Sequence, residues 1–326
     1  MHKIAIFRAL YLGDFLCSVP ALRAIRKHYP HSTITWIGLT GTCELASRYS
    51  DYINNHVIFP GFPLLTDNFD PESFAEFLKS IRDENFDLII QMQGNGSIIN
   101  NLLRTFNAKR LVGFCSDKTA EDENFLYYPS HLHEIQRHLA LLQHINIPPD
   151  GEQIDFPIRQ IDQQSFESAK LNIKDKYVCL HPGSKAEWRR WPIAHFAEVG
   201  DYLMRRGYQV VITGTKSELD LATKLSESMK FEPVITSGRL SLGGTAVLLS
   251  SANFLVTNCT GVSHLAAALK TPSLVISMDG EPDRWGPINK ELHTTIDWSK
   301  NQDFQAVFNE IESSPFIEPS TFSGEG

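Results

Sequence analysis

Residues 255–269, LVTNCTGVSHLAAAL, predict a buried strand over 253–257, a tight polar turn and a helix that begins near Gly261. A helix that starts directly after a strand points its free N–H groups and the positive end of its dipole into the crevice above the strand ends. Phosphate groups bind well at such places. Two interpretations stay open for this stretch: a phosphate site with Thr260, Gly261 and His264, or an ordinary strand-to-helix turn of an α/β protein.

The composition is that of an ordinary globular protein, with 326 residues, 42% of them hydrophobic. The formal charge of −8 argues against nucleic acid or a broadly anionic membrane as the main partner. The N-terminal run is too short and too charged for a signal peptide, and no window is apolar enough to span a bilayer. Five scattered cysteines without C-x-x-C spacing predict a reduced, cytoplasmic protein.

Strands and helices alternate in both halves of the chain, which predicts α/β domains with parallel sheets and helices on both faces. Predicted strands lie at 4–9, 33–39, 57–59, 86–92, 110–114, 177–180, 208–213, 234–236, 253–257 and 273–278. Predicted helices lie at 14–28, 41–49, 74–82, 97–106, 133–145, 166–172, 193–206, 217–229, 241–250 and 302–311. Pro20 suggests a kink or a late start of the first helix.

The segment 116–129 is acidic and irregular, so we expect an exposed loop there. Residues 147–152, IPPDGE, have the composition of a linker. We therefore expect two doubly wound, Rossmann-like domains over 1–155 and 156–312, facing each other across a cleft, and a disordered tail over 313–326. Ligands of such sheets bind at the carboxyl ends of the strands.

The loop 181–192, HPGSKAEWRRWP, concentrates three cations, a glycine, a serine and two tryptophans after a predicted strand. Charge-assisted hydrogen bonds contribute about 1.5–3 kcal/mol each, against about 0.3–1 kcal/mol for a helix dipole. The cations therefore favour a diphosphate ligand more strongly than the dipole does. The alternative is a solvated basic loop in which Trp191-Pro192 packs at a helix start.

Four segments in order resemble glycosyltransferase family nine, the ADP-heptose:lipopolysaccharide heptosyltransferase family with the GT-B fold. They are the L-G-D and P-A-L of residues 12–22, H-P-G-S with R-W-P at 181–192, T-G-T-K-S-E at 213–218, and the stretch 257–269. The resemblance covers roughly residues 3–297. Two positions depart from the family pattern: Cys259 replaces an aspartate, and Gln91 replaces the aspartate of D-x-Q-G.

The resemblance implies an inverting displacement without a covalent intermediate, which needs a base for the acceptor hydroxyl and charge stabilisation for the departing nucleotide. It assigns Asp14 as the base, although the same carboxylate could simply cap a helix. It assigns Arg189 to the phosphates and Glu218 to the ribose. It completes the donor site with Gly183, Ser184, Lys185, Thr260, Gly261 and His264, and places Gly13, Gln93 and Gly94 on the acceptor side. His264 could touch phosphate or merely pack.

The implied partners are a nucleotide-sugar donor and a saccharide or lipid-linked saccharide acceptor, with peripheral contact to the inner membrane surface and no nucleic acid. No cofactor or metal is implied, since the cations of the loop take the metal's usual task. His131, His133 and His138 do not share a helix face, so a packing role is favoured over a metal site. Four of the five tryptophans, 188, 191, 285 and 298, could stack on a ligand or belong to the core. The thiol of Cys259 could be activated by the helix terminus or be inert.

Three alternatives to a lipopolysaccharide heptosyltransferase remain open from the sequence. The same fold could glycosylate a soluble natural product or another glycan. The chain could bind nucleotide-sugars without catalysis, or it could be an epimerase of similar build.

Overall fold

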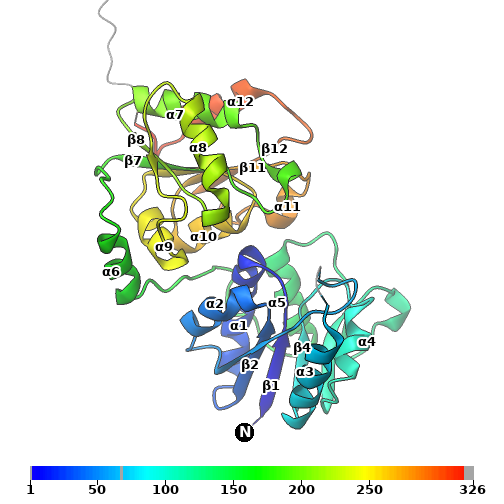
Figure 1. The fold of residues 1–326 in the computed structure, drawn as a ribbon. Helices are drawn as coiled ribbons and strands as arrows, with labels where there is room; N and C mark the ends of the chain where they lie inside the picture. The colour runs from blue at the N-terminus through cyan, green and yellow to red at the C-terminus, as the bar shows by residue number, and fades with distance from the viewer. Residues whose placement is uncertain (1, 67–68, 319–326) are drawn as a thin grey trace, which may run out of the picture. The chain divides into compact units, whose positions relative to one another are not determined.

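The computed structural model describes residues 2–66 and 69–318 and divides the chain into two compact units, Met1–Ile154 and Asp155–Gly326. Each unit contains a six-stranded sheet in which all neighbouring strands are parallel, flanked by helices (Figure 1). This is the α/β architecture that the alternation of the sequence predicts. The division falls one residue before the expected boundary. No helix in the described ranges has both the length and the apolar character needed to cross a membrane.

The first sheet has the order β3-β2-β1-β4-β5-β6. Its strands are β1 (Lys3–Phe7), β2 (Thr33–Gly38), β3 (Asn55–Ile58), β4 (Leu88–Gln91), β5 (Arg110–Cys115) and β6 (Phe125–Tyr127). Its helices are α1 (Leu12–His28), α2 (Cys43–Arg48), α3 (Pro71–Asp83), α4 (Ile99–Arg104) and α5 (Glu134–His144). Pro20 does not delay the first helix, which begins at Leu12.

Alternating side chains of the strands bury the two faces of the first sheet against different helices. Phe7 belongs to a cluster with Phe77 of α3 and Leu102 of α4. Trp36 points to the other face, where its ring lies 4.6 Å from that of Phe15 in α1. Helix α1 therefore lies on the opposite face from α3 and α4 and holds its N-terminus above the end of β1.

Strand β6 lies inside the segment 116–129, for which an irregular loop was expected; that expectation was wrong for 125–127. These residues pair in parallel with residues 113–115 of β5. Three residues at a sheet edge give too short an apolar pattern to be recognised against the acidic residues around them.

The second sheet has the order β12-β11-β10-β7-β8-β9. Its strands are β7 (Tyr177–His181), β8 (Gln209–Ile212), β9 (Val234–Ile235), β10 (Phe254–Asn258), β11 (Ser273–Ser277) and β12 (His293–Asp297). Its helices are α6 (Gln160–Ser168), α7 (Ile193–Arg205), α8 (Leu219–Ser228), α9 (Leu242–Ser250), α10 (Gly261–Leu269), α11 (Pro282–Trp285) and α12 (Phe304–Ser313). Read from β9, this is the strand order of the first sheet.

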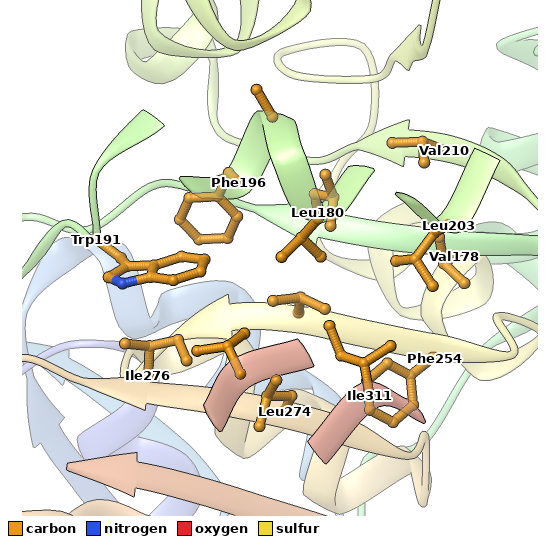
Figure 2. Close-up of a cluster of buried hydrophobic side chains, with 14 of the residues drawn as sticks. Val178, Leu180, Trp191, Phe196, Leu203, Val210, Phe254, Leu274, Ile276 and Ile311 are labelled. Carbon is orange, nitrogen blue, oxygen red and sulfur yellow. The ribbon is translucent and has the colours of Figure 1, made fainter. Parts of the chain in front are cut away.

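One face of the second sheet packs on α7, α8 and α12 through a continuous apolar cluster (Figure 2). Leu180, Val256 and Ile276 come from three neighbouring strands, and Phe196 from α7 covers them. Trp191 is 1% exposed and packs edge-on at 5.3 Å against Trp298. Both tryptophans are therefore core residues, and Trp191 fixes the end of the basic loop to the sheet.

Three further expectations differ from the structure. Helix α6 begins at Gln160 rather than 166, because the Arg159 N–H donates to the Asp162 carboxylate at 2.7 Å and starts the helix there. Helix α11 and strand β12 were not predicted from the sequence. The expected tail from Ser313 is packed through Glu318: Ile317 is 3% exposed, and the Glu318 N–H donates to the Tyr208 hydroxyl at 2.9 Å. The rest of that tail, 319–326, lies outside the described residues.

Candidate functional site

The strand order of the second unit creates a switch point between β7 and β10. From β7 the chain continues outward to β8 and β9, and from β10 it continues the other way to β11 and β12. The connections that leave two such strands diverge, and the crevice between them is where open α/β sheets bind ligands. The loop 181–192 and the turn 259–261 both border this crevice, and we call them the donor-side loops.

Asn258, the last residue of β10, ties the donor-side loops together. Its buried amide donates to the carbonyl of Pro182 at 2.8 Å and to that of Gly183 at 3.3 Å. Its oxygen accepts the N–H of Trp191 at 2.8 Å. One side chain thus holds both ends of the basic loop against the end of β10, so the sequence-predicted phosphate turn and the basic loop form one structure.

Three polar atoms at these loops are buried without a hydrogen-bond partner in the described part of the chain: Arg189 Nε, Trp191 Nε1 and Thr260 Oγ1. Thr260 is the N-cap of α10, yet its hydroxyl makes no capping bond. Unsatisfied buried donors cost about 1–3 kcal/mol each and call for an explanation. Trp191 belongs to the apolar core. A ligand that accepts hydrogen bonds, such as a phosphate, would satisfy Arg189 Nε and Thr260 Oγ1.

The other predicted residues of the basic loop differ in exposure. Ser184 is 6% exposed, whereas Lys185 is open to solvent. The guanidinium of Arg190 turns back into the loop and donates to the Ser184 carbonyl at 3.0 Å. Arg190 therefore braces the loop, while Lys185 and Arg189 are the cations that it presents.

Glu218 follows β8 and reaches the basic loop from the side. It accepts hydrogen bonds from the N–H and the hydroxyl of Thr215, both at 2.8 Å. A Cβ added to Gly183 would lie 2.1 Å from Glu218 Oε1, so any other residue there would displace the Glu218 carboxylate. Burial alone would raise the pKa of Glu218, but nearby His181 and the Thr215 donors hold that pKa below its usual value. Burial lowers the pKa of His181.

At the start of α10, Gly261 is the first helical residue and Cys259 precedes the cap. His264 is 3% exposed, and its ring centroid lies 6.2 Å from that of Trp285. Burial, with a smaller contribution from Asp279, raises the pKa of Cys259 to about 12. Cys259 therefore stays in its thiol form near neutral pH. This favours the interpretation that the residue is inert, because the thiolate is the reactive form.

Asp279, which the sequence analysis passed over, belongs to the same crevice. It comes two residues after the end of β11, and its Oδ2 lies 2.9 Å from Nη2 of Arg189. Its side chain is only 5% exposed. An acidic residue directly after a buried strand, in a sheet that binds at its carboxyl edge, was the signal that could have found it.

The first unit has the equivalent switch point between β1 and β4, and the residues that were predicted for the acceptor side border it. Asp14 and Gly13 lie in the first turn of α1, after β1. Gln93 follows β4, and its side-chain oxygen accepts the N–H of Ala9 at 2.6 Å, which joins the two connections. Gly94 has φ +59° and is exposed.

Asp14 caps the helix, as one of its two predicted roles requires, and it also pairs with Arg8. Its Oδ2 accepts the Tyr11 N–H at 3.4 Å, which caps the helix, and its Oδ1 pairs with Nη2 of Arg8 at 2.9 Å.

Gln91 is fully buried and accepts the Phe114 N–H at 2.9 Å. The residue that departs from the family's D-x-Q-G pattern therefore joins β4 to β5 inside the sheet.

Arg8, Asp14, Glu134, Arg137 and His138 form a group of charged and polar side chains that we call the Arg8 cluster. Glu134 Oε1 accepts a hydrogen bond from Arg8 Nη2 at 2.9 Å, and Glu134 Oε2 lies 2.5 Å from Arg137 Nη1. His138 Nε2 lies 2.8 Å from Arg8 Nη1. Arg8, Glu134, Arg137 and His138 are all at most 5% exposed at the side chain, so α5 supplies the partners that make burial of Arg8 possible.

The charges of the Arg8 cluster are fixed by its surroundings. Burial alone would lower the pKa of Arg8, but Glu134 and Asp14 raise it above its usual value. Burial, reinforced by Arg8, lowers the pKa of His138 to about 3, so its ring is neutral near pH 7.

His133 caps α5, its Nδ1 accepting the Ile135 N–H at 3.1 Å. In residues 2–66 and 69–318, no three His, Cys, Asp or Glu side chains are grouped to hold a metal.

Comparisons with known proteins identify the family. The family model described as glycosyltransferase family 9 (heptosyltransferase) matches residues 74–310, well over half of the chain. The lipopolysaccharide heptosyltransferase 2 of Salmonella typhimurium is 29% identical over 307 residues, covering 88% of this chain and 86% of the relative. The lipopolysaccharide core heptosyltransferase OpsX of Haemophilus influenzae is 22% identical over 301 residues, covering 88% and 82%.

Solved structures agree on the fold. A glycosyl transferase family 9 protein from Veillonella parvula superposes with a TM-score of 0.75 at 20% identity, covering 95% of this chain and 89% of the other. The ADP-heptose lps heptosyltransferase II of E. coli gives 0.72 at 19% identity, covering 91% and 90%. These likenesses and the two parallel sheets confirm the predicted GT-B class. The chain is an enzyme of glycosyltransferase family 9, to which it belongs by its own sequence.

Proposed function

We propose that this chain is an inverting heptosyltransferase that moves a heptose from ADP-heptose to a saccharide of a lipopolysaccharide core. Membership of family 9 and the names of its relatives support the sugar and the acceptor. One observation carries the donor site: the donor-side loops, tied together by Asn258, leave Arg189 Nε and Thr260 Oγ1 buried without partners in the described ranges. The donor diphosphate supplies the missing acceptors.

In this mechanism Asp14 is the general base. The acceptor hydroxyl oxygen forms a bond to the anomeric carbon while its proton passes to the Asp14 carboxylate. On the opposite face the bond from the anomeric carbon to the phosphate oxygen breaks, and its electron pair leaves with the nucleotide. Arg8 holds Asp14 through Oδ1 and through the Asp14 carbonyl at 3.0 Å, which fixes the base in one orientation.

The donor side stabilises the charge of the departing diphosphate. We assign the phosphates to Arg189 and Lys185, with N–H and hydroxyl donors at the start of α10 and in the basic loop. Glu218, held by Thr215, receives the ribose hydroxyls. The remaining assigned residues are Gly183, Ser184, Thr260, Gly261 and His264 for the donor, and Gly13, Gln93 and Gly94 for the acceptor.

A nucleotide screen followed by a transfer assay tests the proposal. ADP should raise Tm more than UDP or GDP, because a ligand that binds only the folded state stabilises it by mass action. ADP-heptose with a heptose-deficient lipopolysaccharide core should then give a heptosylated core and ADP, also in the presence of a chelator. Binding without transfer to any acceptor would indicate a silent binding protein. Release of a modified sugar without acceptor would indicate an epimerase, and transfer only to soluble acceptors another glycan.

The base is tested with Asp14→Ala, which should lower turnover by about 10²–10⁴-fold. ADP affinity should stay within about twofold of the wild type, since Asp14 belongs to the first unit and the proposed phosphate contacts to the second. Asp117→Ala, which removes an exposed cap from the turn at 118–120, is the matched control and should leave turnover unchanged. Near-normal turnover of Asp14→Ala would refute the assignment.

We further propose that the enzyme acts in the cytoplasm on a lipid-linked acceptor and touches the membrane surface peripherally. Support comes from apolar side chains in segments that follow β1, β3 and β4: Tyr11 is 50% exposed, Leu64 86% and Ile98 40%. The carboxyl ends of parallel strands share one sheet edge, so these side chains belong to the edge that carries Asp14. Cosedimentation with lipopolysaccharide-containing vesicles should fall for Leu64→Ser, and unchanged binding would count against this contact.

A further inference from the structure

The ion pair between Arg189 and Asp279 is more enclosed than an ordinary surface pair. Asp279 Oδ1 accepts the Ser277 hydroxyl at 2.8 Å and the Glu281 N–H at 3.3 Å, which leaves Oδ2 directed at Arg189. The Asp279 side chain is 5% exposed and that of Arg189 36%. The carboxylate is therefore held rigidly, and the guanidinium is the partner whose position it determines.

Cys259 contacts the end of β11, the strand that leads to Asp279. Its N–H donates to the Ile276 carbonyl at 2.9 Å, one residue before β11 ends at Ser277. Burial is the main influence on the thiol, but the Asp279 carboxylate and the Arg189 guanidinium both act on it electrostatically, in opposite directions. The residue at which this chain departs from the family aspartate is thus within electrostatic reach of a carboxylate that comes from the neighbouring connection.

We infer that Asp279 is a positioning residue for glycosyl transfer: it supplies, from the connection after β11, the carboxylate that the family pattern carries at position 259, and it holds Arg189 in the donor crevice. This inference rests on the proposed role of Arg189 at the donor phosphates. A fixed guanidinium loses little side-chain freedom when the diphosphate arrives. The carboxylate also offsets part of its charge, so its main contribution is to orientation.

A contribution to orientation rather than to charge predicts that removing the Asp279 carboxylate lowers turnover much more than nucleotide affinity. Asp279→Asn keeps an acceptor for the Ser277 hydroxyl but replaces the ion pair with Arg189 by a weaker, uncharged contact. Because Arg189 is then less well oriented, kcat should fall by at least about tenfold. ADP affinity should change by less than about threefold, because a gain in net positive charge offsets the loss of order. Asp283→Asn removes the same charge from an exposed site in α11 and should leave both unchanged.

Two double variants separate positioning from a merely structural role. In an Arg189→Ala background, Asp279→Asn should have no further effect on kcat, because the residue through which it acts is gone. Cys259→Asp alone sets two carboxylates side by side and should lower kcat, whereas Cys259→Asp with Asp279→Asn should recover most of the wild-type value. Thermal unfolding of each variant checks that it is folded, and Asp279→Glu provides a variant that keeps the charge and should retain more activity than Asp279→Asn.

The outcomes are distinct. No transfer by the wild type with any donor and acceptor would overturn the proposed function itself. Transfer by the wild type with additive effects in both double variants, or with an unchanged kcat for folded Asp279→Asn, would overturn only the role of Asp279. Tighter ADP binding by Asp279→Asn at unchanged kcat would make Asp279 a simple counter-charge and would also refute the inference.

Discussion

At the first switch point the buried charges are matched within the chain, whereas at the second three buried polar atoms have no partner in the described ranges. Arg8 contacts Asp14, Glu134 and His138 together. Arg189 Nε, Trp191 Nε1 and Thr260 Oγ1 have no hydrogen-bond partner among the described residues. The two crevices share one strand order, so the difference comes from the connections that follow the strands and from their side chains. A completed network holds a reactive group in place before the substrate arrives, and an incomplete one gains its missing hydrogen bonds from the ligand.

The largest expected effect on the buried charges of the first unit comes from substituting Glu134. Glu134→Ala leaves Arg8 and Arg137 buried beside a missing carboxylate, and the free energy of unfolding should fall by about 3–5 kcal/mol. Denaturant unfolding measures this loss. Glu84→Ala, which removes the exposed partner of Lys3 at 3.2 Å, should change it by less than about 1 kcal/mol. Equal effects of the two substitutions would show that burial of the Arg8 cluster contributes nothing.

The pH dependence of stability should carry the signature of His138. Its pKa is about 3 in the folded chain, where Arg8, Arg137 and Glu134 face it, against an ordinary value of 6.5. The unfolded state therefore takes up a proton first as pH falls below 6.5, and stability should drop by about 1.4 kcal/mol per pH unit toward pH 4. His138→Gln should remove this part of the slope, and His31→Gln, at an exposed position, should not. An unchanged slope in His138→Gln would contradict the buried neutral ring.

At the second switch point, Asn258→Ala tests the tie between the donor-side loops. It leaves the Trp191 N–H and two carbonyls without their partner, so we expect a loss of about 1–3 kcal/mol in unfolding free energy and weaker ADP binding. Asn309→Ala, which removes an exposed hydrogen bond in α12, is the control for losing an amide. Normal ADP affinity in a folded Asn258→Ala variant would show that the loops form without the tie.

The smallest expected effect is the most specific to the comparison. Thr260→Val removes a hydroxyl without a partner in the free chain, so its unfolding free energy should stay level or rise by up to about 1 kcal/mol, while the Tm increase caused by ADP should shrink. The counterpart in the first unit is Ser18→Ala, whose hydroxyl donates to the Asp14 carbonyl at 2.9 Å. That variant should lose stability by about 1 kcal/mol. If both variants behave alike, the distinction between the two crevices fails.

Local pattern made much of this molecule predictable. Apolar runs located most strands, and the turn at Thr260 and Gly261 and the loop 181–192 were placed after the correct strands. The partners of Arg8 were not predictable, because Glu134 and His138 lie 126 and 130 residues away along the chain. The sequence did show a charge ending an apolar strand, and a charge there must find a partner when buried. Asp279 and β12 were missed because a single residue and a short, mixed strand carry little periodic signal.

The crevices join segments far apart in sequence, and this sets an order of assembly. The Ala9 N–H meets the Gln93 side chain across 84 residues, and Asn258 meets Pro182 across 76. Such distant contacts form slowly and only after the intervening chain exists. During synthesis the Arg8 cluster can close once His138 has emerged, whereas the donor-side loops must wait for Asn258. The first unit can therefore complete its crevice while the ribosome is still making the second, which shortens the time that buried charges such as Arg8 spend without partners.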